Sequence, residues 1–380
     1  MNEGLGGRST RAHHHFFSGS YGQTFKFDYV LITLTLLLIA FGLVVLYSAL
    51  GQNWSGLFNQ AIRLFLGLGC LLFASQLRVS TYYRWAPTIY AGTILLLFAV
   101  EIFGVSSKGS QRWLDLPGLP SFQPSEFLKI SLPLIVGWYL ATRNFKLKSF
   151  DYLALILIVG LPTGLVFLQP DYGTALILLI GVAVMLFLVG LRLRWFAVGL
   201  ALVVVSAPII WNFVFRKYHR ERIITLFNPE RDPLNAGWNI IQSKTAVGSG
   251  GLTGKGLFEG TQSHLDFLPE GHTDFIIAVI GEELGFVWCV ALLSCYLLIF
   301  SRLMYLSTTA TNGFGYVVGT GITVIFFGYV IVNVAMVLGL LPVVGLPLPL
   351  VSYGGSSAIT TMAAFGVALA VCTHKQDLEK

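Results

Sequence analysis

The sequence predicts an all-α, polytopic membrane protein of about ten transmembrane helices, and its composition is the first reason. Of its 380 residues, 55% are hydrophobic and only 11% are charged, whereas a soluble domain carries about 25% charged residues. The mean hydropathy is +0.75. Most of the chain therefore avoids water, and no length is left for a separate soluble domain.

The second reason is that the apolar residues form long uncharged runs, because a helix that crosses a bilayer needs about 20 mostly apolar residues. The first predicted span covers residues 29–50. Further spans are centred on 65–77, 85–103, 127–142, 152–168, 174–190, 195–215 and 275–300. No Asp, Glu, Lys or Arg occurs between Arg302 and Lys375, and prolines divide this stretch into spans near 313–341 and 353–371.

The distribution of Lys and Arg predicts which side of the membrane each loop faces. Short loops on one side and both tails carry most of the basic residues, whereas short loops on the other side hold only Lys108 and Arg112. The positive-inside rule then places both termini in the cytoplasm. We expect a cytoplasmic tail at 1–28, one transmembrane domain at 29–372 and a cytoplasmic tail at 373–380. Basic residues dispersed in this way do not indicate a nucleic-acid-binding face.

One long loop, residues 216–274 between predicted helices seven and eight, departs from this charge pattern. It faces the outer side, yet it carries seven basic residues. Loops longer than about 15 residues are usually functional or disordered. Apolar and aromatic residues such as Phe227, Trp238 and Phe258 recur along this loop. We therefore expect it to be ordered against the bilayer surface.

A basic cluster begins this loop, with Arg216, Lys217, Arg220 and Arg222 inside seven residues. Such a cluster could bind lipid phosphates or a pyrophosphate. The same side chains could instead anchor the chain by extending to the headgroup region. The residues by themselves favour neither interpretation.

A glycine-rich run, residues 248–256, follows in the same loop and contains Lys255. It does not fit the nucleotide-binding P-loop pattern, because Ser249 and Gly256 stand where that pattern needs Gly and Ser or Thr. A role in tight turns is favoured, with Lys255 as a candidate contact for an anion.

Carboxylates cluster where the loop meets predicted helix eight. We expect Asp274 in the first turn or at the N-cap of that helix, where it is either a capping carboxylate or a general base at the outer rim of the membrane. Glu282 and Glu283 follow two turns later. Ionisable groups that deep in a span face a cavity or a partner rather than lipid.

Glu126 and Lys129 lie three residues apart at the start of predicted helix four and hence on one face. Charges entering a membrane are costly, so we expect the two side chains to pair. They form either a structural salt bridge or a group in which Lys129 orients a substrate.

Six stretches in chain order carry a resemblance to a known family. They are 109–113 (GSQRW), 123–129 (QPSEFLK), 169–174 (QPDYGT), 248–262, 267–275 (FLPEGHTDF) and 342–357 (PVVGLPLPLVSYGGSS). Together they resemble the shape, elongation, division and sporulation family over essentially the whole chain. Gly254–Gly256 and Gly260–Gln262 look like the elongation branch of that family, and Gly271 stands where a larger residue is common.

The resemblance implies a peptidoglycan glycosyltransferase that polymerises lipid II by inverting transfer and releases undecaprenyl pyrophosphate. It implies that Asp274 matches the essential acidic residue of the large outer loop, and that Glu126 and Lys129 match a functionally important pair. In that reaction Asp274 fits the general base. The candidate partners of the pyrophosphate are Arg112, Lys129, Arg216, Arg220, Arg222, Lys244 and Lys255.

The resemblance also implies a setting for this reaction. It places the protein in the bacterial inner membrane, with the active site on the periplasmic side. It predicts a class B penicillin-binding protein and the elongation machinery as partners, because the chain has no Ser-x-x-Lys motif for peptide cross-linking. No cofactor is certain; a divalent cation could assist, although no dedicated ligand cluster occurs in the sequence, and the four cysteines have no metal-ligand spacing.

A lipid II flippase is the alternative function. It should line a path across the bilayer with cations, whereas predicted helices nine and ten carry none. The polar residues lie mainly toward the outer side.

Overall fold

The computed structural model describes residues 27–107, 110–115, 121–191, 193–215, 217–228, 236–264, 267–268 and 270–373. The helices of the transmembrane bundle are α1 (Tyr29–Ala49), α2 (Trp54–Gln76), α3 (Val79–Phe103), α4 (Leu128–Thr142), α5 (Ser149–Leu168), α6 (Tyr172–Leu188), α7 (Leu193–Ile209), α11 (Ile276–Glu283), α12 (Gly285–Thr308), α13 (Gly313–Val337) and α14 (Ser356–Thr373). The smaller elements are β1 (Val105–Ser107), β2 (Ser110–Trp113), the 3-10 turn η1 (Pro124–Phe127), the π-helix η2 (Ile210–Val214), α8 (Lys217–Phe227), α9 (Ala236–Ser249) and α10 (Thr261–His264).

The all-α fold class is confirmed. The strands β1 and β2 form a single antiparallel hairpin between α3 and α4. Among the described residues, eight helices are long and apolar enough to cross a membrane, and α7 together with η2 forms one of them. The predicted spans at 127–142 and 174–190 correspond to the shorter helices α4 and α6, of 15 and 17 residues. Each predicted span thus contains a helix, while the number of membrane crossings stays a prediction.

The second span begins much earlier than its predicted centre at 65–77. Helix α2 starts at Trp54, where the Asn53 side chain accepts hydrogen bonds from the backbone N–H groups of Ser55 and Gly56 and so caps the helix. Its first turns carry several polar residues, and one of them, Gln60, faces the protein interior. Gln60 is buried and hydrogen-bonds the chain near Ser352, which is why these turns are less apolar than a lipid-facing span.

The predicted eighth span is two helices rather than one. Helices α11 and α12 meet at Gly285, whose φ of +82° interrupts the regular helix. The glycine-rich run packs its backbone against this break, where Lys255 N donates to Glu282 O and Gly256 N donates to Glu283 O. A Cβ atom at Gly285 would lie 2.3 Å from Gly254 N, so both glycines are needed for the close approach.

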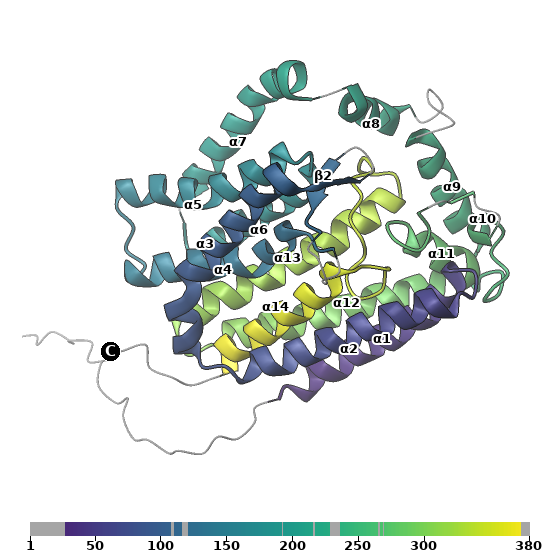
Figure 1. The fold of residues 1–380 in the computed structure, drawn as a ribbon, viewed down its shortest axis with the longest axis horizontal. Coiled ribbons are helices and arrows are strands. Elements are labelled where there is room, and N and C mark those ends of the chain that lie inside the picture. Colours follow the sequence, from purple (N-terminus) through teal and green to yellow (C-terminus); the bar gives the residue numbers. More distant parts are fainter. Residues whose placement is uncertain are drawn as a thin grey trace, which may run out of the picture.

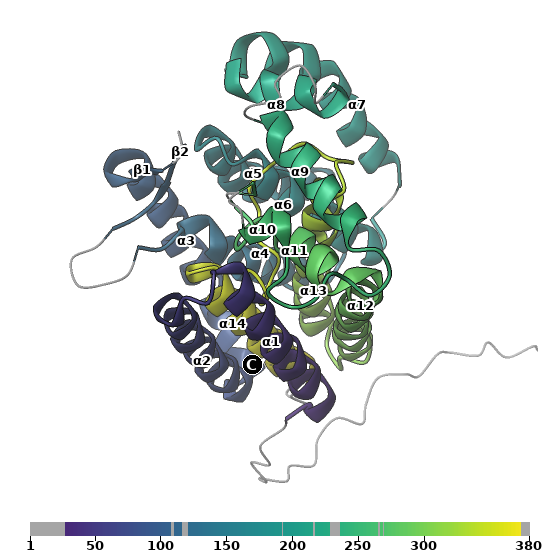
Figure 2. The ribbon, with the colours of Figure 1, turned by 90° about the vertical axis from the view of Figure 1, so that its right-hand side faces the viewer.

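We expect the large outer loop to be ordered rather than disordered, and the structure of its described parts agrees with this expectation. They form α8, α9 and α10, and Ser243 of α9 donates to Val337 O at the end of α13. In Figures 1 and 2, α7 and α8 lie away from the main bundle, while α9 and α10 lie against α11. None of the residues in the most apolar stretch of the α7 span is buried inside the protein.

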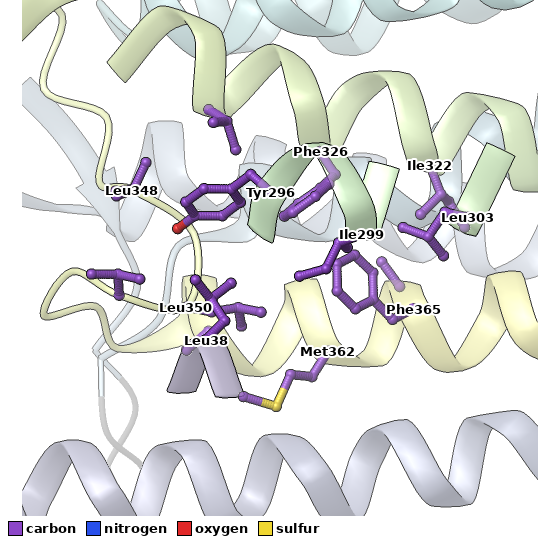
Figure 3. Close-up of a cluster of buried hydrophobic side chains, with 14 of the residues drawn as sticks. Leu38, Tyr296, Ile299, Leu303, Ile322, Phe326, Leu348, Leu350, Met362 and Phe365 are labelled. Atoms are coloured by element: carbon purple, nitrogen blue, oxygen red, sulfur yellow. The ribbon is translucent and has the colours of Figure 1, made fainter. Parts of the chain in front are cut away.

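One of two hydrophobic clusters among the described residues lies where α12, α13 and α14 meet the non-helical chain before α14. Figure 3 shows Tyr296 and Ile299 of α12, Phe326 of α13 and Phe365 of α14 packed together with Leu348. Phe326 and Phe365 make an edge-to-face contact with ring centroids 4.9 Å apart. Leucine and aromatic packing therefore supports the segment that leads into α14.

At the opposite end of the bundle, an ion pair joins α1 to α12. Asp28 caps α1 by accepting from Leu31 N at 2.8 Å and pairs with the Arg302 guanidinium at 2.6 Å. Burial favours the protonated carboxyl, but the hydrogen bonds from Arg302 and Leu31 N outweigh it. The pKa of Asp28 is therefore lowered.

Helices α2 and α14 approach closely through glycine. A Cβ atom at Gly366 would lie 2.4 Å from the Leu71 carbonyl oxygen and 2.8 Å from Ala74 Cβ, and one at Gly67 would lie 2.8 Å from Met362 Sδ. Small residues allow this close backbone packing in membrane helices.

We expect Gly366→Val to lower the stability of the folded protein by about 1–3 kcal/mol, because the added side chain overpacks the α2–α14 contact. Thermal unfolding of the purified protein in detergent measures the change. Gly69→Val on α2 is the matched control, since no atom lies within 4 Å of a Cβ there. Equal melting temperatures for the two variants would show that the close contact is not a constraint.

Candidate functional site

The candidate site is organised around the non-helical segment 338–355, between α13 and α14. Asn333 of α13 is fully buried and donates from Nδ2 to both Leu346 O (2.6 Å) and Asp274 O (2.8 Å). Tyr296 of α12 donates to Pro349 O at 2.6 Å. Tyr353 N donates to His272 O at 2.9 Å. The bonds of Asn333 and Tyr353 join the segment to the chain that carries Asp274, and the bond of Tyr296 joins it to α12.

Asp274 lies one residue before Phe275, the N-cap residue of α11. The expectation that Asp274 itself stands at the N-cap or in the first turn is therefore wrong, because the chain 270–275 forms a turn closed by Phe275 N donating to Glu270 O. The Asp274 side chain is partly exposed and faces Gly345, whose φ is +75°. A Cβ atom at Gly345 would lie 3.5 Å from Asp274 Oδ2.

Glu126 and Lys129 form the predicted ion pair, with Lys129 Nζ 2.5 Å from Glu126 Oε2. Both residues are buried, at 4% and 5% exposure. Thr360 of α14 donates to Glu126 Oε2 at 3.0 Å, and Lys129 Nζ donates to Ser357 Oγ at 3.1 Å. The ammonium also lies over the Tyr329 ring, 4.1 Å from its centroid. The pair thus connects η1 and α4 to the start of α14.

A second buried carboxylate, Asp171, lies at the same end of the bundle and was given no role from the sequence. It is 2% exposed, caps α6 and accepts from Gln123 Nε2 at 2.9 Å. Arg112 of β2 reaches it at 3.5 Å and also donates to the carbonyls of Gln169 and Pro170. The signal was available, because Asp directly before an apolar run is typical of a helix cap. The contacts hold the β-hairpin against the α5–α6 turn.

The basic residues of the outer loop are placed differently from one another. Arg222 NH1 donates to Val343 O at 2.6 Å, two residues from Gly345. Arg220 donates to Phe215 O and Asn212 O at the end of the preceding π-helix. Arg216 lies outside the described residues.

Lys244 is exposed on α9, and its side chain passes beside Gly339, so that a Cβ atom there would lie 2.7 Å from Nζ. Of the loop cations in the described chain, Arg222 and Lys244 therefore lie against segment 338–355.

Lys255 forms an ion pair with a buried carboxylate. Its Nζ lies 2.6 Å from Oε1 of Glu282, a fully buried residue that also accepts from Thr261 Oγ1 and Gln262 N. The adjacent Glu283 is also buried and accepts from Ser48 Oγ of α1 at 2.7 Å. These two glutamates therefore fasten the glycine-rich run and α1 to the broken helix, as expected for intramembrane carboxylates with protein partners.

Metal binding has little support from the protein side chains. Within the described part of the chain, no group of three or more His, Cys, Asp and Glu side chains could hold a metal ion. A divalent cation here would take most of its ligands from substrate phosphates and water, as Mg²⁺ commonly does.

Comparison with known proteins relates this arrangement to a family. Residues 28–377 match the FtsW/RodA/SpoVE family, described as cell cycle proteins. The chain is 45% identical over 354 residues to the peptidoglycan glycosyltransferase MrdB of Escherichia coli K12, covering 93% of this chain and 95% of that protein. It is 37% identical to the probable peptidoglycan glycosyltransferase FtsW of Geobacter sp. strain M18, covering 92% and 97% of the two chains.

Solved structures agree. A chain of a peptidoglycan synthase complex, described as coordinating polymerization and crosslinking, is similar with a TM-score of 0.79 and 33% identity, covering 91% of this chain and 97% of that chain. The rod shape determining protein RodA of Thermus thermophilus is similar with a TM-score of 0.70 and 31% identity, covering 92% and 98%.

The burial of the Glu126–Lys129 pair predicts strong coupling between the two residues. We expect Glu126→Ala and Lys129→Ala each to cost about 3–5 kcal/mol, because each leaves an uncompensated buried charge. The double variant should cost clearly less than the sum of the two. Unfolding free energies of the purified variants in mixed detergent micelles, arranged as a double-mutant cycle, measure the coupling.

Lys146→Ala combined with Glu126→Ala is the control cycle, since Lys146 is exposed beyond the far end of α4. That pair should be additive within about 0.5 kcal/mol. Additive costs for Glu126 and Lys129 themselves would mean that the observed ion pair does not stabilise either charge.

Proposed function

We propose that this chain, a peptidoglycan glycosyltransferase that belongs to the FtsW/RodA/SpoVE family, polymerises lipid II into glycan strands for cell elongation and rod-shape maintenance. Both substrates of this reaction are lipid-linked sugars carrying pyrophosphate. A protein that handles them needs a membrane domain, a base and cations at one end of that domain, and the described residues include candidates for the base and the cations.

The proposed step is a single displacement. The 4-hydroxyl of the acceptor GlcNAc attacks C1 of the donor MurNAc, so that the O4–C1 bond forms while the bond from C1 to the phosphate oxygen breaks. The proton of the hydroxyl goes to Asp274, and undecaprenyl pyrophosphate leaves with the electron pair of the broken bond. One displacement converts the α-phosphate into a β-1,4 glycoside. General base catalysis contributes typically about 10²–10⁴-fold to such a reaction.

The observation that carries this proposal is that one segment, 338–355, and the α14 start that follows it bring the candidate residues to one end of the bundle. Asp274 faces Gly345, Arg222 binds Val343 O, and Lys129 binds Ser357. The candidate base, the Arg222 guanidinium and the buried Glu126–Lys129 ion pair are thus arranged along a single stretch of chain. Cations beside a leaving pyrophosphate stabilise the charge that develops on it.

Arg222 is the strongest candidate for the pyrophosphate among the loop cations. Its guanidinium has five N–H donors in a planar fork that suits phosphate oxygens, and its contact with Val343 O holds it two residues from Gly345. Arg112 and Lys255 are held by Asp171 and Glu282, respectively, so we propose that they position the hairpin and the glycine-rich run. Lys244 and Arg216 stay candidates, and Arg220 is better explained as an anchor of the π-helix.

A class B penicillin-binding protein and the elongation machinery are the proposed partners. The similar chain from a peptidoglycan synthase complex supports this, because that complex is described as joining polymerization to crosslinking. We also propose a bacterial inner-membrane location with the site facing the periplasm. The bias of Lys and Arg in the short loops supports this orientation.

Asp274→Asn should abolish polymerisation while the protein stays folded, because the amide keeps the size of the side chain but cannot accept the proton. The expected rate loss is at least about 10²-fold. Purified protein with its class B partner and labelled lipid II, followed by gel separation of the glycan products, measures the rate. Glu259→Gln, which changes an exposed carboxylate of the same loop, is the control and should polymerise normally.

Near-normal polymerisation by Asp274→Asn would exclude Asp274 as the base. Absence of polymer from the unmodified protein in the same assay, together with transfer of labelled lipid II across a vesicle membrane, would instead support the flippase alternative.

Arg222→Lys should raise the lipid II concentration needed for half-maximal rate by roughly tenfold, because lysine keeps the charge but loses the planar fork. Initial rates against lipid II concentration, at matched expression and thermal stability, give this value. Arg220→Lys is the matched control: it should change stability without changing the lipid II requirement, since Arg220 donates to backbone carbonyls of its own segment. If both variants match the parent, the cluster is an anchor and the pyrophosphate site should be sought near Lys129.

Reporter fusions test the predicted orientation. A reporter after Lys380 should indicate the cytoplasm, and one inserted in the loop near Gly260 should indicate the periplasm, because the basic short loops lie on the side of both termini. Reports of the same side from both positions would contradict the proposed topology.

A further inference from the structure

A polar cavity lies at the end of the bundle opposite the candidate site. Helices α4 and α6 both begin beside site residues, at Lys129 and Asp171, and end at Thr142 and Leu188. The turns that follow them, toward α5 and α7, surround an open cavity of about 570 Å³. Nothing in the proposed glycosyl transfer uses this cavity.

The cavity is lined by two cations and an aromatic pair. Lys148 and Tyr152 come from the start of α5, and Arg194 and Trp195 come from the start of α7. Tyr152 and Trp195 stack with ring centroids 4.4 Å apart. The Arg194 guanidinium lies 5.7 Å from the Trp195 ring centroid. No carboxylate is among the described residues that line the cavity.

The nearest carboxylate in sequence, Asp151, interacts with the Lys148 charge only at longer range, because its ion pair is with another residue. It is buried and accepts from Tyr139 OH at 2.8 Å and from Lys148 N at 2.7 Å, and its ion pair is with Arg143 at 3.1 Å. In the described chain, neither the Lys148 ammonium nor the Arg194 guanidinium has a salt-bridge partner. The cavity therefore has a net positive lining.

An unused hydrogen-bond donor points to a ligand with acceptor oxygens. The Nε1 atom of Trp195 is shielded from solvent and has no hydrogen-bond partner in the described structure. Buried Trp N–H groups usually find an acceptor. An acceptor oxygen of a bound ligand would satisfy this donor.

The surroundings of the cavity match a lipid rather than a small soluble anion. Exposed apolar side chains flank the turns, including Phe150 (73% exposed) and Leu193 (69% exposed). Trp and Tyr are typical of the headgroup level of a membrane, and basic pockets between transmembrane helices bind anionic headgroups. The most apolar stretch of the α7 span contains no buried residue. A ligand that contacts both α5 and α7 would therefore also hold α7 against the bundle.

We propose that this cavity binds the phosphate headgroup of an anionic phospholipid, with Lys148 and Arg194 on the phosphate and Trp195 Nε1 donating to a phosphate or ester oxygen. The acyl chains would extend along the exposed faces of α5 and α7. This site is separate from the proposed glycosyl transfer, and its test does not depend on that activity.

Native mass spectrometry of the full-length protein tests the proposal, with phosphatidylglycerol and phosphatidylcholine titrated separately into the detergent-solubilised sample. The parent should retain phosphatidylglycerol in preference to phosphatidylcholine. Lys148→Gln combined with Arg194→Gln should weaken phosphatidylglycerol binding by roughly tenfold or more, because two cations are lost. Lys146→Gln is the matched control, since it removes an exposed cation of the same turn that does not line the cavity.

Trp195→Phe provides a second, milder variant, because phenylalanine keeps an aromatic ring beside Tyr152 but lacks the N–H donor and one ring of the indole. It should also weaken phosphatidylglycerol binding at unchanged thermal stability. Equal retention of the two lipids, or binding by the double variant that equals binding by the Lys146→Gln control, would overturn the proposal. Displacement of the lipid by an equal concentration of inorganic phosphate would also overturn it, because the cavity would then be a site for a soluble anion.

Discussion

The candidate site depends on one constraint: segment 338–355 leaves its backbone polar groups without helical partners inside a helical membrane domain. Unsatisfied backbone groups at membrane depth cost several kcal/mol each, so side chains or other backbone must supply their partners. Asn333, Tyr296 and Gln60 do this from three different helices. Asn333 also donates to the Asp274 carbonyl. The side chain that satisfies a backbone carbonyl of the segment therefore also fixes the position of the proposed base.

The buried charges follow the same logic. Glu126 pairs with Lys129, Asp171 with Arg112, and Glu282 with Lys255. A buried ion pair contributes little net stability, but removing one member leaves an uncompensated charge, so each pair strongly disfavours arrangements in which its partners separate. In this way the β-hairpin is held relative to α6 and the glycine-rich run relative to α11, whereas α4 is held to α14 by the hydrogen bonds that Thr360 and Ser357 make with the Glu126–Lys129 pair.

The sequence predicted which residues belong to this site better than it predicted the role of each residue. Glu126 and Lys129 were predicted to pair because three residues separate them on one helical face, and their contact is local. Arg112 and Lys255 were predicted as pyrophosphate contacts because they are cations on the outer side. Their partners, Asp171 and Glu282, are 59 and 27 residues away in the chain, and no local pattern reveals a contact over that separation. Asp171 was missed although its place before an apolar run signals a helix cap, because a cap signal does not reveal the contact with Arg112.

The sequence by itself determined that the chain is an all-α membrane protein, which apolar stretches contain helices, and which family motifs it carries, because apolar runs and motifs are properties of consecutive residues. Only the tertiary structure decided that helix eight breaks at Gly285, since that break exists where residues 250–256 dock their backbone against it. It alone also decided which cations face segment 338–355 and which are bound by carboxylates. These contacts form between side chains that meet across the bundle. Because the partners lie far apart in the chain, no sequence periodicity predicts them.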